Sequence, residues 1–180
     1  MKQVVVFFMI FLFFPLGEIE AQSTELLDAK NGYKEFKFGS RYTEFKEDLV
    51  FFFEPNEGYK GYEYNGQNHS SFLGTEWESF KPAFYNDKLI SLEFYFDSDI
   101  QTLQNLLQDL EVLFGEPRLG PLEDELGNRV FDNFFAWRGE KIGLDLTRYS
   151  NLYFSESLRN KTVVKIMPLD ASLIMLSDDF

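Results

Sequence analysis

The stretch that decides the fold is Trp77–Asp97, which reads WESFKPAFYNDKLISLEFYFD. Two runs in which apolar and polar residues alternate meet in it at Asn86-Asp87. Alternation of period two around an Asn-Asp pair predicts an antiparallel hairpin with one buried face. Pro82 cannot donate a hydrogen bond to a ladder, so its strand is expected at an edge or with a bulge. The expected buried face consists of Phe80, Pro82, Phe84, Ile90, Leu92, Phe94 and Phe96.

The segment after this hairpin predicts a long helix over residues 99–114. Its apolar residues recur at helical spacing and would lie on one face. Gly115 then provides a left-handed cap, and Pro117 prevents the helix from continuing. The predicted stripe consists of Ile100, Leu103, Leu107, Leu110 and Phe114.

More strands are predicted further along the chain. Val130–Arg138 and Lys141–Tyr149 alternate and meet at Gly139-Glu140, which predicts a second hairpin. Thr162–Met167 is a last extended segment that completes the sheet.

The residues before the first hairpin predict a strand and a short helix. Tyr33–Phe38 alternates, and Ser40 or Thr43 can cap a short helix at about 41–50. Val50–Phe53 is either the end of that helix or a buried strand, and periodicity does not choose. The fold class is therefore α+β. A single antiparallel twisted sheet built from hairpins packs on the long helix (99–114) and the short helix (about 41–50).

The N-terminus predicts export. Lys2 precedes the apolar run Val4–Leu16, which is too short to span a bilayer, and Ala21 is a small residue at a cleavage position. We expect residues 1–21 to be a cleaved signal peptide, with an uncleaved N-terminal anchor as the alternative. The remaining chain divides into a flexible arm (22–31), one α+β domain (32–168) and an acidic C-terminal tail (169–180).

Composition excludes several functions. The 180 residues include 17 basic and 30 acidic side chains, one His and no Cys, for a net charge of −13. Such acidity argues against nucleic-acid partners, and the absence of Cys excludes thiol catalysis, cysteine-based metal sites and a lipoprotein anchor. We expect a periplasmic or secreted protein without stable membrane insertion after signal cleavage.

Several short sequence motifs resemble those of known protein families. They are Phe38-Gly39-Ser40 with Glu44-Phe45, the Asn86–Leu89 turn, Leu113–Pro117, and Trp137 before a strand. Over most of residues 33–149 the pattern resembles small exported bacterial α+β proteins of unassigned function. It is also similar to beta-lactamase-inhibitor-like and outer-membrane-assembly-lipoprotein modules. The resemblance implies a binding or assembly module rather than an enzyme, and the lipidated Cys of the lipoproteins is missing.

Catalytic motifs are not found. His69 is interpreted as a solvated loop histidine, with general-base chemistry as the alternative. Glu93 and Asp145 lie on polar strand faces and would be neighbours if the two hairpins pair, which would suit glycan hydrolysis. We interpret them as an ordinary solvated sheet face, with glycan hydrolysis as the alternative. We expect no catalytic residue, no metal site and no cofactor.

The aromatic residues are the best candidates for binding. Even without residues 1–21, the chain keeps 28 of its 33 aromatic side chains. Flat amphipathic rings on a surface are typical of protein interfaces, although these rings can also fill a core. We therefore predict a non-enzymatic binding module for an envelope protein, with carbohydrate binding or weak glycan hydrolysis through the same rings and carboxylates as the alternative. The candidate binding residues are Tyr59, Tyr62, Tyr64, Trp77 and Trp137.

Overall fold

The computed structural model of the chain describes residues 24–97, 99–123, 126–150 and 158–170. The predicted signal (1–21) and the tail beyond Asp170 lie outside these residues. Two α-helices, one 3-10 helix and twelve strands are described. In chain order they are α1 (Thr24–Lys30), β1 (Gly32–Tyr33), β2 (Phe36–Lys37), η1 (Tyr42–Glu44), β3 (Leu49–Phe53), β4 (Tyr59–Tyr64), β5 (Ser71–Phe72), β6 (Thr75–Glu76), β7 (Ser79–Tyr85), β8 (Lys88–Phe96), α2 (Ile100–Phe114), β9 (Arg118–Leu119), β10 (Phe131–Arg138), β11 (Ile142–Tyr149) and β12 (Thr162–Pro168).

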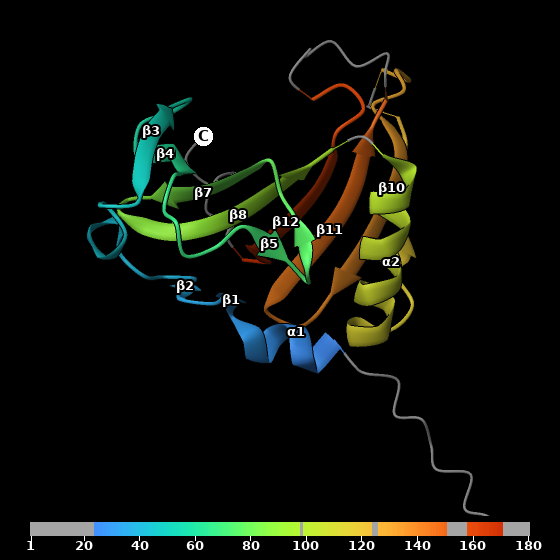
Figure 1. The fold of residues 1–180 in the computed structure, drawn as a ribbon, viewed down its shortest axis with the longest axis horizontal. Helices are drawn as coiled ribbons and strands as arrows, with labels where there is room; N and C mark the ends of the chain where they lie inside the picture. Colours follow the sequence, from blue (N-terminus) through green and yellow to red (C-terminus); the bar gives the residue numbers. More distant parts are fainter. Residues whose placement is uncertain (1–23, 98, 124–125, 151–157, 171–180) are drawn as a thin grey trace, which may run out of the picture.

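One large antiparallel sheet forms the frame of the molecule. Its eight strands lie in the order β3-β4-β7-β8-β12-β11-β10-β9, and every neighbouring pair is antiparallel. The sheet is strongly twisted, since β7 and β8 run across Figure 1 while β10 and β11 stand nearly upright beside α2. Two small two-stranded sheets, β1-β2 and β5-β6, accompany it. The predicted α+β class is confirmed.

The hairpin predicted from Trp77–Asp97 forms as β7 and β8. Asn86 and Asp87 have φ values of 47° and 69°, a left-handed conformation that these two residue types tolerate well. The strand containing Pro82 lies inside the sheet, but β4 pairs with it only from Ala83 onward. A bulge follows at once, and it places Leu89 rather than Ile90 opposite Phe84.

The long helix is confirmed as α2. The Asp99 carboxylate caps it by accepting the Gln101 backbone N–H at 3.1 Å, and Gly115 ends it with φ 79°. Its buried stripe contains Leu106, whereas Ile100, which the spacing placed there, is nearly half exposed. Within the described residues, no helix combines the length and hydropathy needed to cross a bilayer.

The second hairpin is also confirmed, as β10 and β11. The last strand, β12, does not extend the sheet at an edge. It lies between β8 and β11 and joins the two hairpins into one sheet. The core therefore runs unbroken across Phe94, Val164 and Leu146, which face one another on neighbouring strands and are fully buried.

Two predictions for the N-terminal third are wrong. The single strand expected over Tyr33–Phe38 is instead the antiparallel pair β1 and β2 around a turn at Lys34-Glu35. No α-helix spans 41–50, because only the single 3-10 turn η1 forms before β3 begins at Leu49. The backbone of Val50–Phe53 instead pairs with β4, so this ambiguous segment is a strand. Residues 24–30 of the predicted flexible arm form α1, which packs on α2 and β11 and buries Leu27.

The Asp28 carboxylate fastens α1 to the sheet. It accepts the backbone N–H groups of Glu140, Lys141 and Ile142 at 2.7–2.9 Å, in the turn between β10 and β11. Gly139 permits this approach, because a β-carbon there would overlap the carboxylate. Burial acts to raise the pKa of Asp28, but the three hydrogen bonds and the Lys141 charge outweigh it and lower the pKa.

Candidate protein-interaction surface

Strand β3 is the open edge of the sheet. Among the described strands, only β4 pairs with it. Four successive apolar residues on this strand are exposed: Val50 by 51%, Phe51 by 56%, Phe52 by 52% and Phe53 by 41%. At the other end of the sheet, β9 contains only two residues. An edge strand with exposed apolar side chains is a ready template for another extended chain.

The rings of β3 are held by residues one or two strands further in. Phe51 meets Tyr62 edge-on with ring centroids 5.9 Å apart, and the Lys81 ammonium lies 4.2 Å from the centre of the Phe52 ring. Phe53 covers Gly61, where a β-carbon would overlap the ring. The apolar edge is therefore a supported surface rather than a set of loose side chains.

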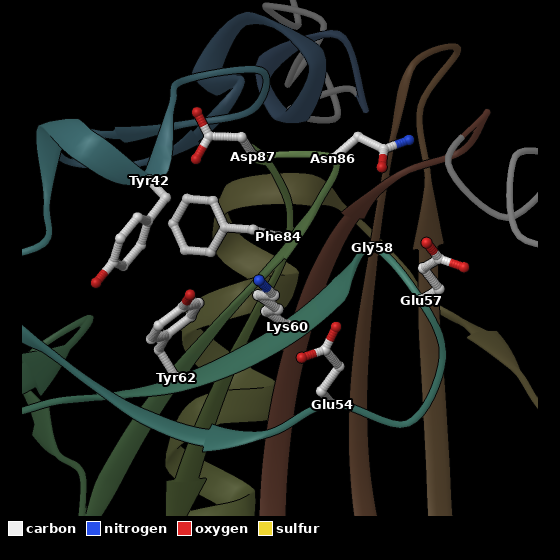
Figure 2. A pocket seen from close by; sticks show the side chains of 9 residues that line it. All are labelled: Tyr42, Glu54, Glu57, Gly58, Lys60, Tyr62, Phe84, Asn86 and Asp87. Carbon is white, nitrogen blue, oxygen red and sulfur yellow. The ribbon is translucent and has the colours of Figure 1, made fainter.

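A cavity of about 500 Å³ adjoins this edge. Figure 2 shows the rings of Tyr42, Tyr62 and Phe84 grouped along one side of it, with Glu54 and Glu57 on the other and Lys60 between them. The Tyr42 and Tyr62 rings are stacked with centroids 4.6 Å apart, and Phe84 meets both edge-on. The cavity borders the edge, because Tyr62 lines the cavity and meets the Phe51 ring, and Glu54 directly follows β3.

The charges of this cavity favour a cation. Glu54, Glu57 and Asp87 line it, against the single ammonium of Lys60. The pKa of Tyr62 is raised, first by burial, then by Tyr42, and then by the carboxylates of Asp87 and Glu54. Aromatic faces beside carboxylates are the surroundings that attract ammonium and guanidinium groups.

Two of the five predicted binding residues border this surface. Tyr59 lies beside Phe53, with ring centroids 5.9 Å apart, and is half-buried. Tyr62 is only 7% exposed, so it supports Phe51 and the cavity wall rather than offering an open ring. Tyr64 is buried against Phe36 and Phe80 and is not brought to the surface.

The two tryptophans do not form a binding platform. Trp137 is 1% exposed, and its indole N–H donates to the Gly115 carbonyl at 2.8 Å, so the prediction of a surface role for it is wrong. Trp77 is half-buried against Phe80 and Phe94. Trp137 lies in the core because the β10-β11 register places it opposite Leu144, on the face of the sheet that the helices cover.

His69 is not a solvated loop residue. Its side chain is 13% exposed and stacks on the Tyr64 ring. Its Nε2 pairs with the Glu35 carboxylate, and its Nδ1 lies 2.9 Å from the Lys34 ammonium. These partners give His69 a structural role, because they fasten its loop to the β1-β2 turn.

The carboxylates expected to be neighbours are separated by a lysine. Strand β12 places Lys165 between Glu93 and Asp145, and the Lys165 ammonium lies 2.9 Å from the Glu93 carboxylate. Asp145 pairs with Arg138 at 2.5 Å. Each carboxylate is therefore held by its own cation, on strands that β12 separates. In the described part of the chain, no group of three His, Asp or Glu side chains could hold a metal ion.

The main residues of the surface, Phe51–Phe53, were not among the predicted site residues. Four consecutive apolar residues are typical of a buried strand. The signal for an exposed edge strand lies in the residues on either side of the run. Lys46-Glu47-Asp48 and Glu54-Pro55-Asn56-Glu57 bracket the run with charged and turn-forming residues, as expected for an edge. No protein-family model matches the sequence, and neither the curated proteins nor the solved structures compared with it gave a match.

Proposed function

We propose that this protein is an exported, non-enzymatic interaction module of the cell envelope that binds an extended segment of a partner protein along β3. The observation that carries the proposal is the run of four exposed apolar residues, Val50–Phe53, on the outermost strand of the sheet. Export is supported by Lys2, the apolar run Val4–Leu16 and the absence of Cys.

Binding would occur by strand addition. The outer edge of β3 offers backbone N–H and C=O groups, and a partner strand would satisfy them while covering the rings of Phe51–Phe53. Main-chain hydrogen bonds supply affinity in such complexes, and the contacts of alternate side chains supply specificity. Phe51 lies towards Tyr62 and Phe53 towards Gly61, so the partner meets a ring on each face of the sheet.

The partner segment should be apolar with a basic residue at one end. Its apolar side chains would pack on Phe51–Phe53, and its Lys or Arg would enter the cavity beside Glu54 and Glu57. A second copy of this chain fits less well. In an antiparallel pair centred on Phe51, Asp48 of each copy would face Glu54 of the other, and both copies carry a net charge of −13.

Synthetic peptides test the proposal directly. Three labelled peptides of about ten residues share an alternating Val-Thr centre, and they end in Lys, in Glu, or in Lys with alternate amide nitrogens methylated. With the full chain, fluorescence anisotropy should show the lysine peptide binding at least about tenfold more tightly than the glutamate peptide. The methylated peptide should not bind, because it lacks the donors that extend the sheet.

Substitutions then locate the binding site on the protein. Val50→Lys places a charge on the open edge and should abolish binding of the lysine peptide. The matched control is Leu119→Lys, an equally drastic change at an 81% exposed residue on β9 at the opposite edge, and it should leave the affinity unchanged. Equal losses from the two variants, or a concentration-dependent dimer that Val50→Lys dissociates, would reject the proposal in favour of nonspecific adsorption or self-association.

A further inference from the structure

We infer that a second cavity, bounded by α1 and the end of α2, binds an amphiphile with one acyl chain and an anionic head group. The cavity has a volume of about 410 Å³ and lies between α1, the end of α2 and the inner face of the sheet. The volume is within the range of small-molecule sites. This site is independent of the surface proposed for protein partners, with which it shares no lining residue.

The inner part of the cavity is apolar. Leu144 and Ile166 come from the centre of the sheet, Phe114 from the end of α2, and Leu27 from α1. These four side chains are each at most 8% exposed and form the floor of the cavity. Leu73, in the turn between β5 and β6, is more than one third exposed and completes the outer part. Such walls favour a hydrocarbon chain over a polar ligand.

Three lysines lie around this apolar interior. Lys30, Lys34 and Lys37 line the cavity, and none of the described residues that line it is acidic. This composition is unusual in a chain with 30 acidic and 17 basic residues. The strong negative total therefore conceals a local positive region at the rim of one apolar cavity.

The lysines have the capacity to bind an anion. The Lys37 ammonium donates to the Lys30 carbonyl at 3.0 Å, and the Lys34 ammonium lies 2.9 Å from His69 Nδ1. The Lys30 carbonyl is a neutral acceptor, and so is His69 Nδ1 when the imidazole is uncharged. None of the three lysines forms an ion pair with a described carboxylate. Since an ammonium has three donors, each lysine retains at least two for a carboxylate or phosphate.

A competition assay tests the inference. Dansyl-undecanoic acid is bound to the full chain, and ligands with twelve-carbon chains are added to displace it. Laurate and lauroyl-lysophosphatidylglycerol represent the two sources of such an anion, a free fatty acid and a phospholipid. Dodecanol and lauroyl-lysophosphatidylcholine carry the same chain without a net negative charge. At least one anionic ligand should compete about tenfold better than both controls, and which one does so identifies the source. Equal competition by all four, or none, would overturn the inference.

Variants test whether binding occurs in this cavity. The double variant Lys30→Gln/Lys34→Gln should weaken the preferred anion about tenfold and leave dodecanol unchanged. Lys46→Gln/Lys88→Gln makes the same change in net charge at exposed lysines outside the cavity and should have no effect. Leu73→Asn replaces the apolar side chain with a polar one that tolerates the φ of 50° at this position. It should weaken the binding of every ligand. Unchanged affinities in Leu73→Asn and in Lys30→Gln/Lys34→Gln would place the ligand elsewhere and overturn the inference.

The dependence of affinity on acyl-chain length gives an independent test that the preferred anion occupies the apolar cavity. Each methylene removed from the acyl chain should weaken competition by up to about fourfold while the chain fills the cavity. A dependence on micelle formation instead of chain length would indicate detergent-like adsorption. If light scattering shows a dimer of the full chain that dissociates when laurate is added, the cavity is a contact between two copies and the inference fails.

Discussion

The phenyl ring of Phe53 occupies the space above Gly61, directly across the β3-β4 pair. Any β-carbon at Gly61 would overlap the ring, so this glycine is required for close approach of a side chain and not for a turn. The ring in turn covers backbone that would otherwise be open, which is a known way of compensating a glycine in a strand. The exposed edge thus depends on a residue of the neighbouring strand.

Gly61→Ala should therefore displace Phe53. The added methyl competes with the ring for the same space. Because the ring is 41% exposed and can turn outward, the free energy of unfolding should fall by less than the roughly 1–3 kcal/mol of overpacking in a closed core. Urea denaturation of the variant and the parent chain measures this loss. The variant should also bind the lysine peptide more weakly, because the ring no longer lies in place on the edge.

A double-mutant cycle isolates the contact. If Gly61→Ala acts through the ring, the same substitution should cost almost nothing when Phe53→Ala is already present. Equal costs in both backgrounds would show that Gly61 acts through its backbone, and the contact would then lose its assigned role.

Removal of the Asp28 carboxylate should loosen α1. Asp28→Asn keeps the size of the side chain but weakens its hydrogen bonds from the backbone of the β10-β11 turn, and we expect a loss of about 1–2 kcal/mol at neutral pH. Hydrogen exchange of the α1 amides should accelerate more than that of α2. Glu25→Gln removes a charge from the same helix without such contacts and serves as the control.

The pH dependence of this contribution has a defined sign. The pKa of Asp28 is lowered from its ordinary value of 3.8, so the folded chain favours the charged form. The stabilisation is complete above about pH 4 and is lost as the pH falls through the folded pKa. The difference in unfolding free energy between the parent and Asp28→Asn should therefore shrink below pH 4. A difference that persists unchanged at lower pH would contradict the charged hydrogen bonds.

The sequence predicts the elements of this fold better than their environment. Both hairpins and α2 are predicted correctly, because alternation, turn residues and caps are local signals that the tertiary structure did not override. The position of β12 between the hairpins depends on pairing across more than sixty residues, from Phe94 to Val164, and no local signal encodes it. The packing of α1 depends in the same way on Asp28 reaching Glu140.

The candidate site was predicted only in part for the same reason. The sequence predicts surface positions for the tyrosines and tryptophans, yet Trp137 is core because α2 ends beside it and Gly115 accepts its N–H. Phe51–Phe53 resemble a core strand by composition, and only the order of strands in the sheet reveals them as an edge. Which face of a strand the helices cover is a property of the assembled sheet.

Trp137→Phe tests this reassignment from surface to core. The substitution removes the hydrogen bond to Gly115 and part of a buried ring, so the free energy of unfolding should fall by about 1–3 kcal/mol. The affinity for the lysine peptide should not change at temperatures where the variant is folded. A stable variant with weakened binding would restore Trp137 to the binding surface.

Arg138 and Asp145 should respond to substitution asymmetrically. Burial raises the pKa of Asp145, against the opposing effect of Arg138, and their contact is a close ion pair rather than a well-aligned hydrogen bond. Arg138→Met removes the ion-pair partner of a buried carboxylate and leaves it only the Lys165 charge, so it should cost up to about 3–5 kcal/mol. Asp145→Asn should cost less, because the Arg138 guanidinium still donates to the carbonyls of Trp137 and Leu144.

The pH dependence of this pair has the opposite sign to that of Asp28. Since the folded pKa of Asp145 lies above its ordinary value of 3.8, the charged carboxylate is disfavoured by folding. The parent chain should lose stability relative to Asp145→Asn as the pH rises from below 4 through the folded pKa. Measured unfolding free energies of the two chains at several pH values check this, and a parent that gains relative stability over that range would contradict it.

Charge substitutions in the cavity beside β3 should change peptide affinity in opposite directions. Lys60 lies between the aromatic rings and the carboxylates, where a cationic side chain of the partner would bind. Lys60→Gln removes this competitor and should tighten binding of the lysine peptide several-fold, whereas Glu57→Gln should weaken it by a similar factor. Both effects should decrease with rising salt, because these side chains are exposed. If Lys60→Gln instead weakens binding, Lys60 contacts the partner itself, and the cavity does not receive a basic side chain.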